Sequence, residues 1–590
     1  MQEPLSFYNE QISEYKHQLS QVKKRLYASS MLRLAIFCIA VVGIYLAYGN
    51  GKLVAGIIVG TIVLFIFLVS RHSDLQYKRD RIKALLQINS TEIEVLERKF
   101  HHLPDGKEFN RGDHYFCQDI DLFGRGSFFQ YANRTALKEG GAYFSSLLLG
   151  NDIEDIPAKQ EAIDELGKMP KWRQGFSAVA SLVKTETPFN VIVKWLKGYQ
   201  VFVPQYMSFL PTIFSLVSLV LITLYFMGLL NGWGVVVWMF LGLGITGAHL
   251  KKINKLSENT SKVQSTFHQY QKLIMQLEET EFTAGLLKKE QAVVLHDKVR
   301  TSKILEEFSK ILNAFDQRNN MIFGFLGNAF LLWDLRQSFR LENWIQSHGG
   351  KVEAWFDVVI FFDAYNSLGN FAYNHPKYAF PKITNDDVVL KPTKAGHPLL
   401  DPNKSVLNDF QIDKEQFFII TGANMAGKST FLRTVSLQIV MANVGLPVCA
   451  SYSEYAPIKL ITSMRTSDSL ADDESYFFSE LKRLKFIVDE IQKDRYFIIL
   501  DEILKGTNST DKAIGSRKFV EKLVASKSTG IIATHDLSLC EAAEDMAQVH
   551  NFYFDAEIIN NELHFDYTLK NGICKNMNAS FLLKKMEIVE

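Results

Sequence analysis

The feature that most constrains the fold is a stretch of 53 residues, Gly198–Leu250, that contains no Asp, Glu, Lys or Arg. Asn231-Gly232 interrupts it near the middle and predicts a turn between two apolar helices, about Met207–Leu230 and Trp233–His249. Two core helices of a soluble domain are the alternative. A run of this length is more typical of membrane helices, which need about 20 apolar residues each to cross ~30 Å of hydrocarbon. We therefore expect a transmembrane helical hairpin over residues 201–250.

A second pair of apolar runs lies near the N-terminus. Leu34–Gly51 and Leu53–Ser70 are each 18 residues long and uncharged, with only Lys52 between them. A buried core helix is the alternative for either run alone. Gly49-Asn50-Gly51 is a turn signal, so the pair predicts a first transmembrane hairpin over 34–70. Because the first run starts late and lacks a small-residue cleavage site, we expect an anchor rather than a removed signal peptide.

Lysine and arginine residues cluster on one side of both predicted hairpins. The positive-inside rule assigns the cation-rich segments to the cytoplasm. Both termini and every large segment are therefore expected there, in a multi-pass protein of the cytoplasmic (inner) membrane. The flanking cations are Lys23, Lys24, Arg25, Arg33, Arg71, Lys78, Arg79, Arg81, Lys194, Lys197, Lys251, Lys252 and Lys255.

Apolar residues with heptad spacing flank the hairpins. An alternation of three and four residues is typical of helices that pack along a seam. Such helices either pack inside one domain or form long arms that carry the membrane hairpins, and the sequence leaves both open. The repeats are Leu5, Tyr8, Ile12, Tyr15, Leu19, Val22 and Leu26, and then Ile253, Leu256, Thr260, Val263, Phe267, Tyr270, Ile274 and Leu277.

Composition limits the classes of protein to which the chain can belong. Hydrophobic residues make up 47% of the chain, which excludes a disordered protein. A net charge of +1 neither supports nor excludes nucleic-acid binding, because proteins that neutralise many phosphates are usually more basic. Five widely spaced cysteines match no metal-ligand spacing, which argues against a zinc module and for a reducing compartment.

A phosphate-binding loop is predicted near the C-terminus. Residues 422–430, Gly-Ala-Asn-Met-Ala-Gly-Lys-Ser-Thr, fit G-x-x-x-x-G-K-[ST] between a β-type run, Phe417–Thr421, and a predicted helix, Phe431–Asn443. Backbone N–H groups of such a loop and the start of its helix bind phosphate. We expect Lys428 to hold the β- and γ-phosphates of ATP and Ser429 to hold Mg²⁺. The other expected nucleotide-binding residues are Gly422, Asn424, Met425, Gly427 and Thr430.

Two further strand patterns end in polar residues. Asp501 and Glu502 follow Tyr496–Leu500, and His535 closely follows Thr529–Ala533. Asp501 is expected to support Mg²⁺, Glu502 to orient or deprotonate the attacking water, and His535 to sense the γ-phosphate. An α/β P-loop ATPase domain with a parallel sheet and a phosphate site at its C-terminal edge is the consistent fold.

These segments resemble the MutS family, the mismatch-repair branch of the ABC-type ATPases. Residues 421–430 are close to T-G-x-N-M-[AG]-G-K-S-T, in which Asn424-Met425 is the distinguishing pair. Asp501–Thr507 resembles D-E-I-G-R-G-T, and Ala533-Thr534-His535 matches the family's switch histidine. Further matching segments are Gly396-His397-Pro398, Ser467–Leu470, Ser475-Tyr476-Phe477 and Glu480, and, before the ATPase region, Asp121–Gly124, Ser127–Phe129, Asn133–Thr135 and Lys159–Ile163.

The resemblance implies a homodimer with composite ATP sites, in which Ser475 of one subunit reaches the nucleotide of the other. Asp472-Asp473-Glu474 replaces a small, glycine-containing stretch of the family pattern and brings negative charge to that contact. The expected division is 1–33 heptad helix, 34–70 hairpin 1, 71–112 helical stalk, 113–200 MutS-like core and lever segment, 201–250 hairpin 2, 251–385 returning lever helices and core, and 386–590 ATPase domain.

Two departures separate the chain from DNA-clamping relatives. It shows no mismatch-reading domain with a Phe-x-Glu wedge, and the second hairpin stands where those relatives have the clamp that closes on DNA. The leading hypothesis is a membrane-anchored MutS-like ATPase that undergoes a clamp-like change, with DNA left open as its client and no small-molecule substrate evident beyond ATP. The alternatives are a transporter-like ATPase that moves its membrane helices and a nucleotide-gated scaffold. No L-S-G-G-Q segment precedes Asp501, which argues against the transporter, and Glu502 argues against the scaffold.

Overall fold

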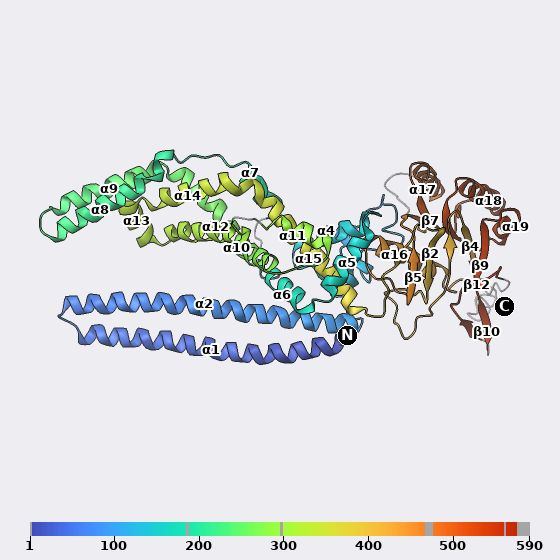
Figure 1. Ribbon diagram of the computed structural model, residues 1–590, viewed down its shortest axis with the longest axis horizontal. Helices are drawn as coiled ribbons and strands as arrows, with labels where there is room; N and C mark the ends of the chain where they lie inside the picture. Colours follow the sequence, from blue (N-terminus) through green and yellow to red (C-terminus); the bar gives the residue numbers. More distant parts are fainter. Residues whose placement is uncertain (1–2, 184–187, 296–298, 466–475, 560–561, 575–590) are drawn as a thin grey trace.

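The described chain is elongated, with an α/β domain at one end, a helical body next to it, and two helical arms that extend away from the sheet (Figure 1). This arrangement confirms the expected helical N-terminal region followed by a C-terminal α/β domain. The computed structural model describes residues 3–183, 188–295, 299–465, 476–559 and 562–574.

The first arm is a hairpin of two long helices, α1 (Pro4–Leu46) and α2 (Gly51–Leu96). Each helix joins one predicted apolar run to a polar stalk without a break. The Asn50 side chain accepts a hydrogen bond from the backbone N–H of Leu53 and so caps α2, as the turn signal predicts. Large apolar side chains are exposed on the half of the arm next to this turn, among them Leu34, Phe37, Ile39, Val42, Val59, Ile62, Val63, Ile66 and Phe67.

The second arm consists of α8 (Leu210–Phe226), α9 (Gly232–Gly247), α10 (Leu250–Glu278), α12 (Thr301–Asp316) and α13 (Met321–Leu331). The hairpin of α8 and α9 comes from the 53-residue uncharged stretch, and its turn lies at the same end of the molecule as the turn of the first arm (Figure 1). α10 follows α9 after a 65° bend. All heptad residues of α10 are buried, so this repeat reflects interior packing, largely against α12.

Within the described residues, α1 and α2 are long and apolar enough to cross a membrane. A third span results only if the bent pair of α9 and α10 is counted as one, and α8 and α13 are apolar but shorter. The helical hairpins are therefore present at both expected positions, and the crossing of a membrane by four helices stays a prediction.

The body is organised around α15 (Val352–Asn374), which is buried over most of its length and contacts α4, α5 and α6. The buried carboxylate of Asp363 accepts hydrogen bonds from the backbone N–H groups of Ala136 and Leu137 and so fixes the start of α4. The remaining body helices are α3 (Phe128–Ala132), α4 (Lys138–Leu149), α5 (Ile156–Gly167), α6 (Pro170–Ala180), α7 (Phe189–Lys197) and α11 (Gly285–Ala292). α14 (Trp333–His348) packs on α12 in the second arm (Figure 1).

A buried polar network fixes the first arm to α15. Arg134 Nε donates to Glu92 Oε1 at 2.7 Å, and Asn374 Nδ2 donates to Glu92 Oε2 at 2.7 Å. The Tyr8 hydroxyl in turn donates to Asn374 Oδ1 at 2.7 Å. Loss of any partner would leave the buried Glu92 carboxylate unpaired, at a large cost in free energy. Since Glu92 lies on α2 and Tyr8 on α1, the network joins both helices of the arm to the body.

A six-stranded sheet in the order β12-β9-β4-β8-β7-β6 forms the core of the α/β domain. β9, β4, β8, β7 and β6 are parallel, so the carboxyl ends of β4, β8 and β7 are neighbours at one edge. The strands are β4 (Phe417–Gly422), β6 (Lys459–Ser463), β7 (Tyr496–Asp501), β8 (Thr529–Ala533), β9 (Val549–Phe554) and β12 (Lys570–Asn571). The helices of this domain are α16 (Lys428–Val444), α17 (Tyr476–Glu490), α18 (Ser509–Ala525) and α19 (Ala542–Asp545).

A smaller sheet and a hairpin complete the domain. The smaller sheet has the order β1-β5-β2-β3, and β10 pairs with β11. Their bounds are β1 (Lys382–Ile383), β2 (Val388–Thr393), β3 (Ile412–Asp413), β5 (Tyr452–Tyr455), β10 (Ala556–Ile559) and β11 (Glu562–Phe565).

Candidate functional site

The loop between β4 and α16 has the shape that the sequence pattern predicts. Gly427 and Met425 have φ angles of 105° and 68°, so the chain turns through left-handed conformations. A Cβ at Gly422 would lie 2.6 Å from the carbonyl oxygen of Phe554, which makes glycine necessary there. The N-cap residue of α16, Gly427, has no side chain that could cap the helix, so among the described residues the first N–H groups are left for an anion.

Lys428 is folded into the loop. Its Nζ donates to the carbonyl oxygens of Gly422 at 2.7 Å and Ala423 at 3.1 Å, and it lies 3.2 Å from His535 Nε2. Burial lowers the pKa of Lys428. An anion in the loop would favour its charged form, so the site fits a phosphate.

Ser429 and Asp501 provide two oxygens that suit a magnesium ion. Ser429 Oγ donates to Asp501 Oδ2 at 2.9 Å, across the strand β8 that separates β4 from β7. Burial raises the pKa of the Asp501 carboxyl. A hydroxyl and one carboxylate are the sparse protein ligand set that Mg²⁺ uses when phosphate oxygens and water supply the rest.

Glu502 lies at the centre of a small charged group. Its carboxylate is 3.2 Å from His535 Nε2 and 3.5 Å from Lys505 Nζ. The hydrogen bond from His535 is the main reason that the pKa of Glu502 is lowered to about 2, and Lys505 adds to it. Glu502 is therefore ionised at neutral pH and can accept a hydrogen bond that orients the attacking water.

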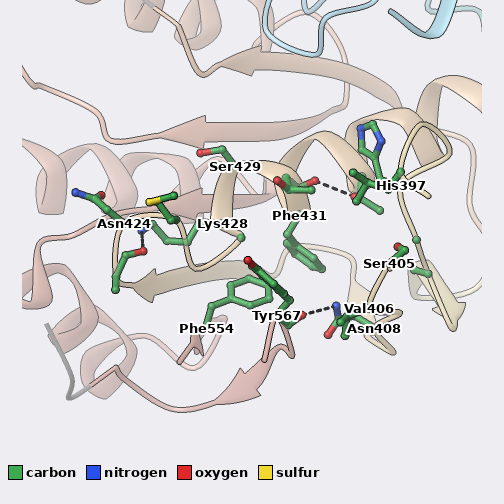
Figure 2. Close-up of a pocket in the computed structure, with 18 of the residues that line it drawn as sticks. His397, Ser405, Val406, Asn408, Asn424, Lys428, Ser429, Phe431, Phe554 and Tyr567 are labelled. Carbon is green, nitrogen blue, oxygen red and sulfur yellow. Dashed lines mark hydrogen bonds between the residues drawn. The ribbon is translucent and has the colours of Figure 1, made fainter. Parts of the chain in front are cut away.

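A cavity of about 460 Å³ extends from the loop towards residues 395–408. Figure 2 shows the side chains that line it. Tyr567, which is 43% exposed, presents its ring in the cavity, where a Cβ at Gly427 would lie 3.1 Å from the ring. Asn408 fixes this segment, because its Nδ2 donates to the Tyr567 carbonyl at 3.1 Å and its Oδ1 accepts from Leu569 N at 2.7 Å. A flat ring beside a phosphate loop suits stacking of a base.

The expected site residues are thus brought together with one exception. Asn424, Met425, Gly427, Lys428, Ser429, Thr430, Glu502 and His535 line the cavity, and Gly422 and Asp501 contact its lining residues. Ser475 and the acidic stretch before it lie outside the described residues. Sequence reasoning missed Lys505, Asn408 and Tyr567. The first stands where the family pattern has Arg, but the other two reach the site only through folding.

The segment between α2 and α3 that contains Asp119 and Asp121, here called the connector, lies against the α/β domain near this site. Asp119 accepts from Thr462 Oγ1 at 2.6 Å and from Arg465 N at 2.9 Å. Asp121 forms a bidentate pair with Arg465 at 2.7 and 2.9 Å and lies 3.4 Å from Arg433 on α16. The helix that starts at the phosphate loop is thereby linked to the body.

Comparison with known proteins agrees with the resemblance seen in the sequence. The family model described as MutS domain V matches residues 418–587. The chain is 32% identical over 223 residues to "MutS protein homolog 4" of Homo sapiens. This aligned region covers 36% of this chain and 23% of that protein. It is 31% identical over 261 residues to "DNA mismatch repair protein MutS" of Chloroflexus aurantiacus. This second aligned region covers 42% of this chain and 27% of that protein. The chain therefore matches only about a quarter of the length of these relatives.

Proposed function

From the premise that the C-terminal region of this chain belongs to the MutS family, we propose that the protein is a membrane-anchored, Mg²⁺-dependent ATPase whose cycle moves its arms. The observation that carries the proposal is the meeting of five side chains at the ends of three neighbouring strands. These side chains are Lys428, Ser429, Asp501, Glu502 and His535.

Binding uses the loop and the cavity beside it. Lys428 and the free N–H groups at the start of α16 hold the β- and γ-phosphates. Ser429 and Asp501 would hold Mg²⁺, which would supply positive charge that offsets the charge of the phosphates. The base stacks on Tyr567, whose segment Asn408 keeps in place.

Hydrolysis uses the charged group around Glu502. Its carboxylate accepts a proton from water as the water oxygen forms a bond to the γ-phosphorus and the bond to the β-bridging oxygen breaks, giving ADP and phosphate. His535 contacts both Glu502 and Lys428 and so couples the base to the phosphate-binding lysine. Lys505 keeps Glu502 ionised in the same group.

The arms respond to this site through the body. Arg433 on α16 and Arg465 after β6 both contact Asp121 of the connector, so a shift of the phosphate loop displaces the connector. By family resemblance the active form is a homodimer, and Ser475 of one subunit completes the site of the other. A closed dimer changes the spacing of the two pairs of arms.

Membrane anchoring is the second part of the proposal. Apolar side chains are exposed on both arms at the end far from the sheet, as Figure 1 and the burial of these residues together indicate. We place the two arm turns, near Asn50 and Asn231, outside the cytoplasmic membrane and the α/β domain in the cytoplasm. Cysteine labelling from outside intact cells tests this topology. Labelling near Asn50 and Asn231 is expected, and labelling of a cysteine at Ser405 would contradict it.

The ATPase cycle acts either on DNA or on the membrane. Relatives named for DNA mismatch repair favour DNA, whereas the apolar second arm favours work on the membrane itself, as in a transporter-like or scaffold ATPase. Duplex binding measured at several salt concentrations decides between them, because affinity from phosphate contacts falls steeply with salt. Absence of binding, or binding without a salt slope, would exclude the DNA client.

ATP turnover tests the catalytic part. Glu502→Gln is expected to bind ATP and to lower hydrolysis by about 10²–10⁴-fold, because the general base is lost. Lys428→Ala is expected to weaken nucleotide binding itself. Glu521→Gln on the exposed face of α18 is the matched control and should leave turnover unchanged. Unchanged turnover in both site variants would overturn the site assignment.

A further inference from the structure

α13 comes from a third uncharged stretch, residues 319–333, which lies between Arg318 and Asp334. These two residues form an ion pair at 2.9 Å, with Asp334 almost fully buried. The ion pair joins the residue before the apolar segment to the residue after it. α13 therefore forms a short apolar unit between two polar parts of the second arm.

α13 packs tightly onto the apolar hairpin of α8 and α9. Trp238 Nε1 donates to Ser218 Oγ at 2.8 Å, and Ser218 Oγ donates to the carbonyl oxygen of Phe330 at 2.8 Å. A Cβ at Gly242 would lie 2.4 Å from the carbonyl oxygen of Ala329, so glycine permits this close approach. Ser218 lies at the middle of α8, and Gly242 lies in the second half of α9, so α13 packs beside the middle of the hairpin.

The outer face of α13 is apolar and exposed. Met321 and Ile322 are 87% and 72% exposed, and Phe325 and Leu326 follow one turn later with about half of their surface exposed. A groove of about 500 Å³ between α13 and α8 continues this surface and is lined by Ile222, Ile322, Phe323, Leu326 and Phe330, among others. The surface is continuous with exposed apolar side chains of the hairpin, Leu216, Leu219, Val220, Val237 and Phe240.

We propose that this face of α13, with its groove, extends from the cytoplasmic leaflet into the middle of the bilayer and takes lipid acyl chains as a third membrane element of the second arm. The inference rests on the proposed membrane location. Its 11 residues extend about 16 Å, which is too short to cross ~30 Å of hydrocarbon. Its base carries Arg318, and the neighbouring start of α10 carries Lys251, Lys252 and Lys255, which suit the anionic headgroups of that leaflet.

Lipid is favoured over a second copy of the chain by this continuity and by the position of the cations. Uncharged surface runs from α13 onto both helices of the hairpin, and cations begin only where the apolar helices end. Large exposed apolar patches of soluble proteins are rare and mark an interaction site. A bilayer covers the whole surface at once.

Spin labels on the full-length protein in lipid vesicles test the proposal. Three single labels are compared by their accessibility to oxygen, which concentrates in lipid, and to a nickel chelate, which stays in water. Ile322→Cys reports on α13, Leu219→Cys on α8, and Glu307→Cys on the exposed polar face of α12, each with Cys38→Ser because Cys38 is exposed. The proposal predicts that labels at Ile322 and Leu219 are both accessible to oxygen and shielded from nickel, unlike the label at Glu307.

The other outcomes separate the two proposals. Nickel access at Ile322 with lipid shielding at Leu219 would overturn the role of α13 and leave the membrane location standing. Nickel access at both positions would overturn both. Shielding of Ile322 from both reagents, with magnetic coupling between two labels, would show that a second copy covers α13 and would overturn the lipid assignment.

Discussion

Ser429 Oγ donates a 2.9 Å hydrogen bond to Asp501 Oδ2, although 72 residues separate them along the chain. Ser429 is the second residue of α16, which follows β4, and Asp501 ends β7, with β8 between the two strands. The contact therefore brings the phosphate loop and the acidic strand end to one point of the sheet edge. It is the geometric basis for assigning both residues to Mg²⁺.

Ser429→Ala is expected to raise the Mg²⁺ concentration needed for half-maximal turnover by about tenfold or more, because one oxygen ligand and the partner of Asp501 are lost together. Titration of turnover with Mg²⁺ at saturating ATP measures it. Ser436→Ala on the same helix is the control, since the Ser436 hydroxyl bonds only the carbonyl of Leu432 among its described contacts. Equal Mg²⁺ dependence in the two variants would contradict the assignment.

Leu504 has a φ of 59° where the family pattern has glycine, and its side chain is buried against Gly515 on α18. A left-handed conformation costs a residue with a Cβ about 1–2 kcal/mol. Leu504→Ala keeps that strain and loses the packing, whereas Leu504→Gly loses slightly more packing and removes the strain. We therefore expect the glycine variant to unfold at a higher temperature than the alanine variant. The reverse order in thermal unfolding would show that the conformation is not strained.

His375 is partly buried, with its Nε2 at 2.8 Å from the Tyr131 hydroxyl and its Nδ1 at 2.7 Å from the Phe371 carbonyl. Burial lowers its pKa from 6.5 to about 4. The unfolded chain binds this proton more readily, so His375 contributes stability above pH 6.5 that is lost as the pH falls towards 4, on the order of 2–3 kcal/mol. Denaturant unfolding of the wild type and of His375→Gln between pH 7 and 4 measures it. An equally steep loss in the variant would assign the effect to other groups.

The sequence predicts those parts of the molecule that depend on local pattern. The loop at 422–430 and the strand ends at Asp501 and Ala533 follow from residue type and spacing, and the hairpins follow from uncharged runs with turn signals. Parallel pairing then brings these strand ends together, which a general rule for parallel sheets also predicts.

Other parts depend on long-range packing, which local pattern does not encode. Tyr567 reaches the site only because Asn408, 159 residues earlier, holds its backbone. α13 has 11 residues, fewer than a membrane-spanning helix needs, so the length of its apolar run does not mark it as a membrane element. Its place beside α8 and α9 is set by Ser218 and Gly242. The heptad pattern of α10 left open whether the helix packs inside a domain or forms an arm. In the structure it is part of the second arm, and its seam is buried, largely against α12 of the same arm.

The central claim, that the nucleotide cycle moves the arms, is tested most directly by one distance. Spin labels at Ser261→Cys on the exposed face of α10, in the Cys38→Ser background, report the spacing of the second arms in the dimer. The account predicts that this spacing differs between the ADP-bound state and the ATP-bound state trapped by Glu502→Gln. An identical distance distribution in the two states would contradict it and would leave the arms as a passive tether.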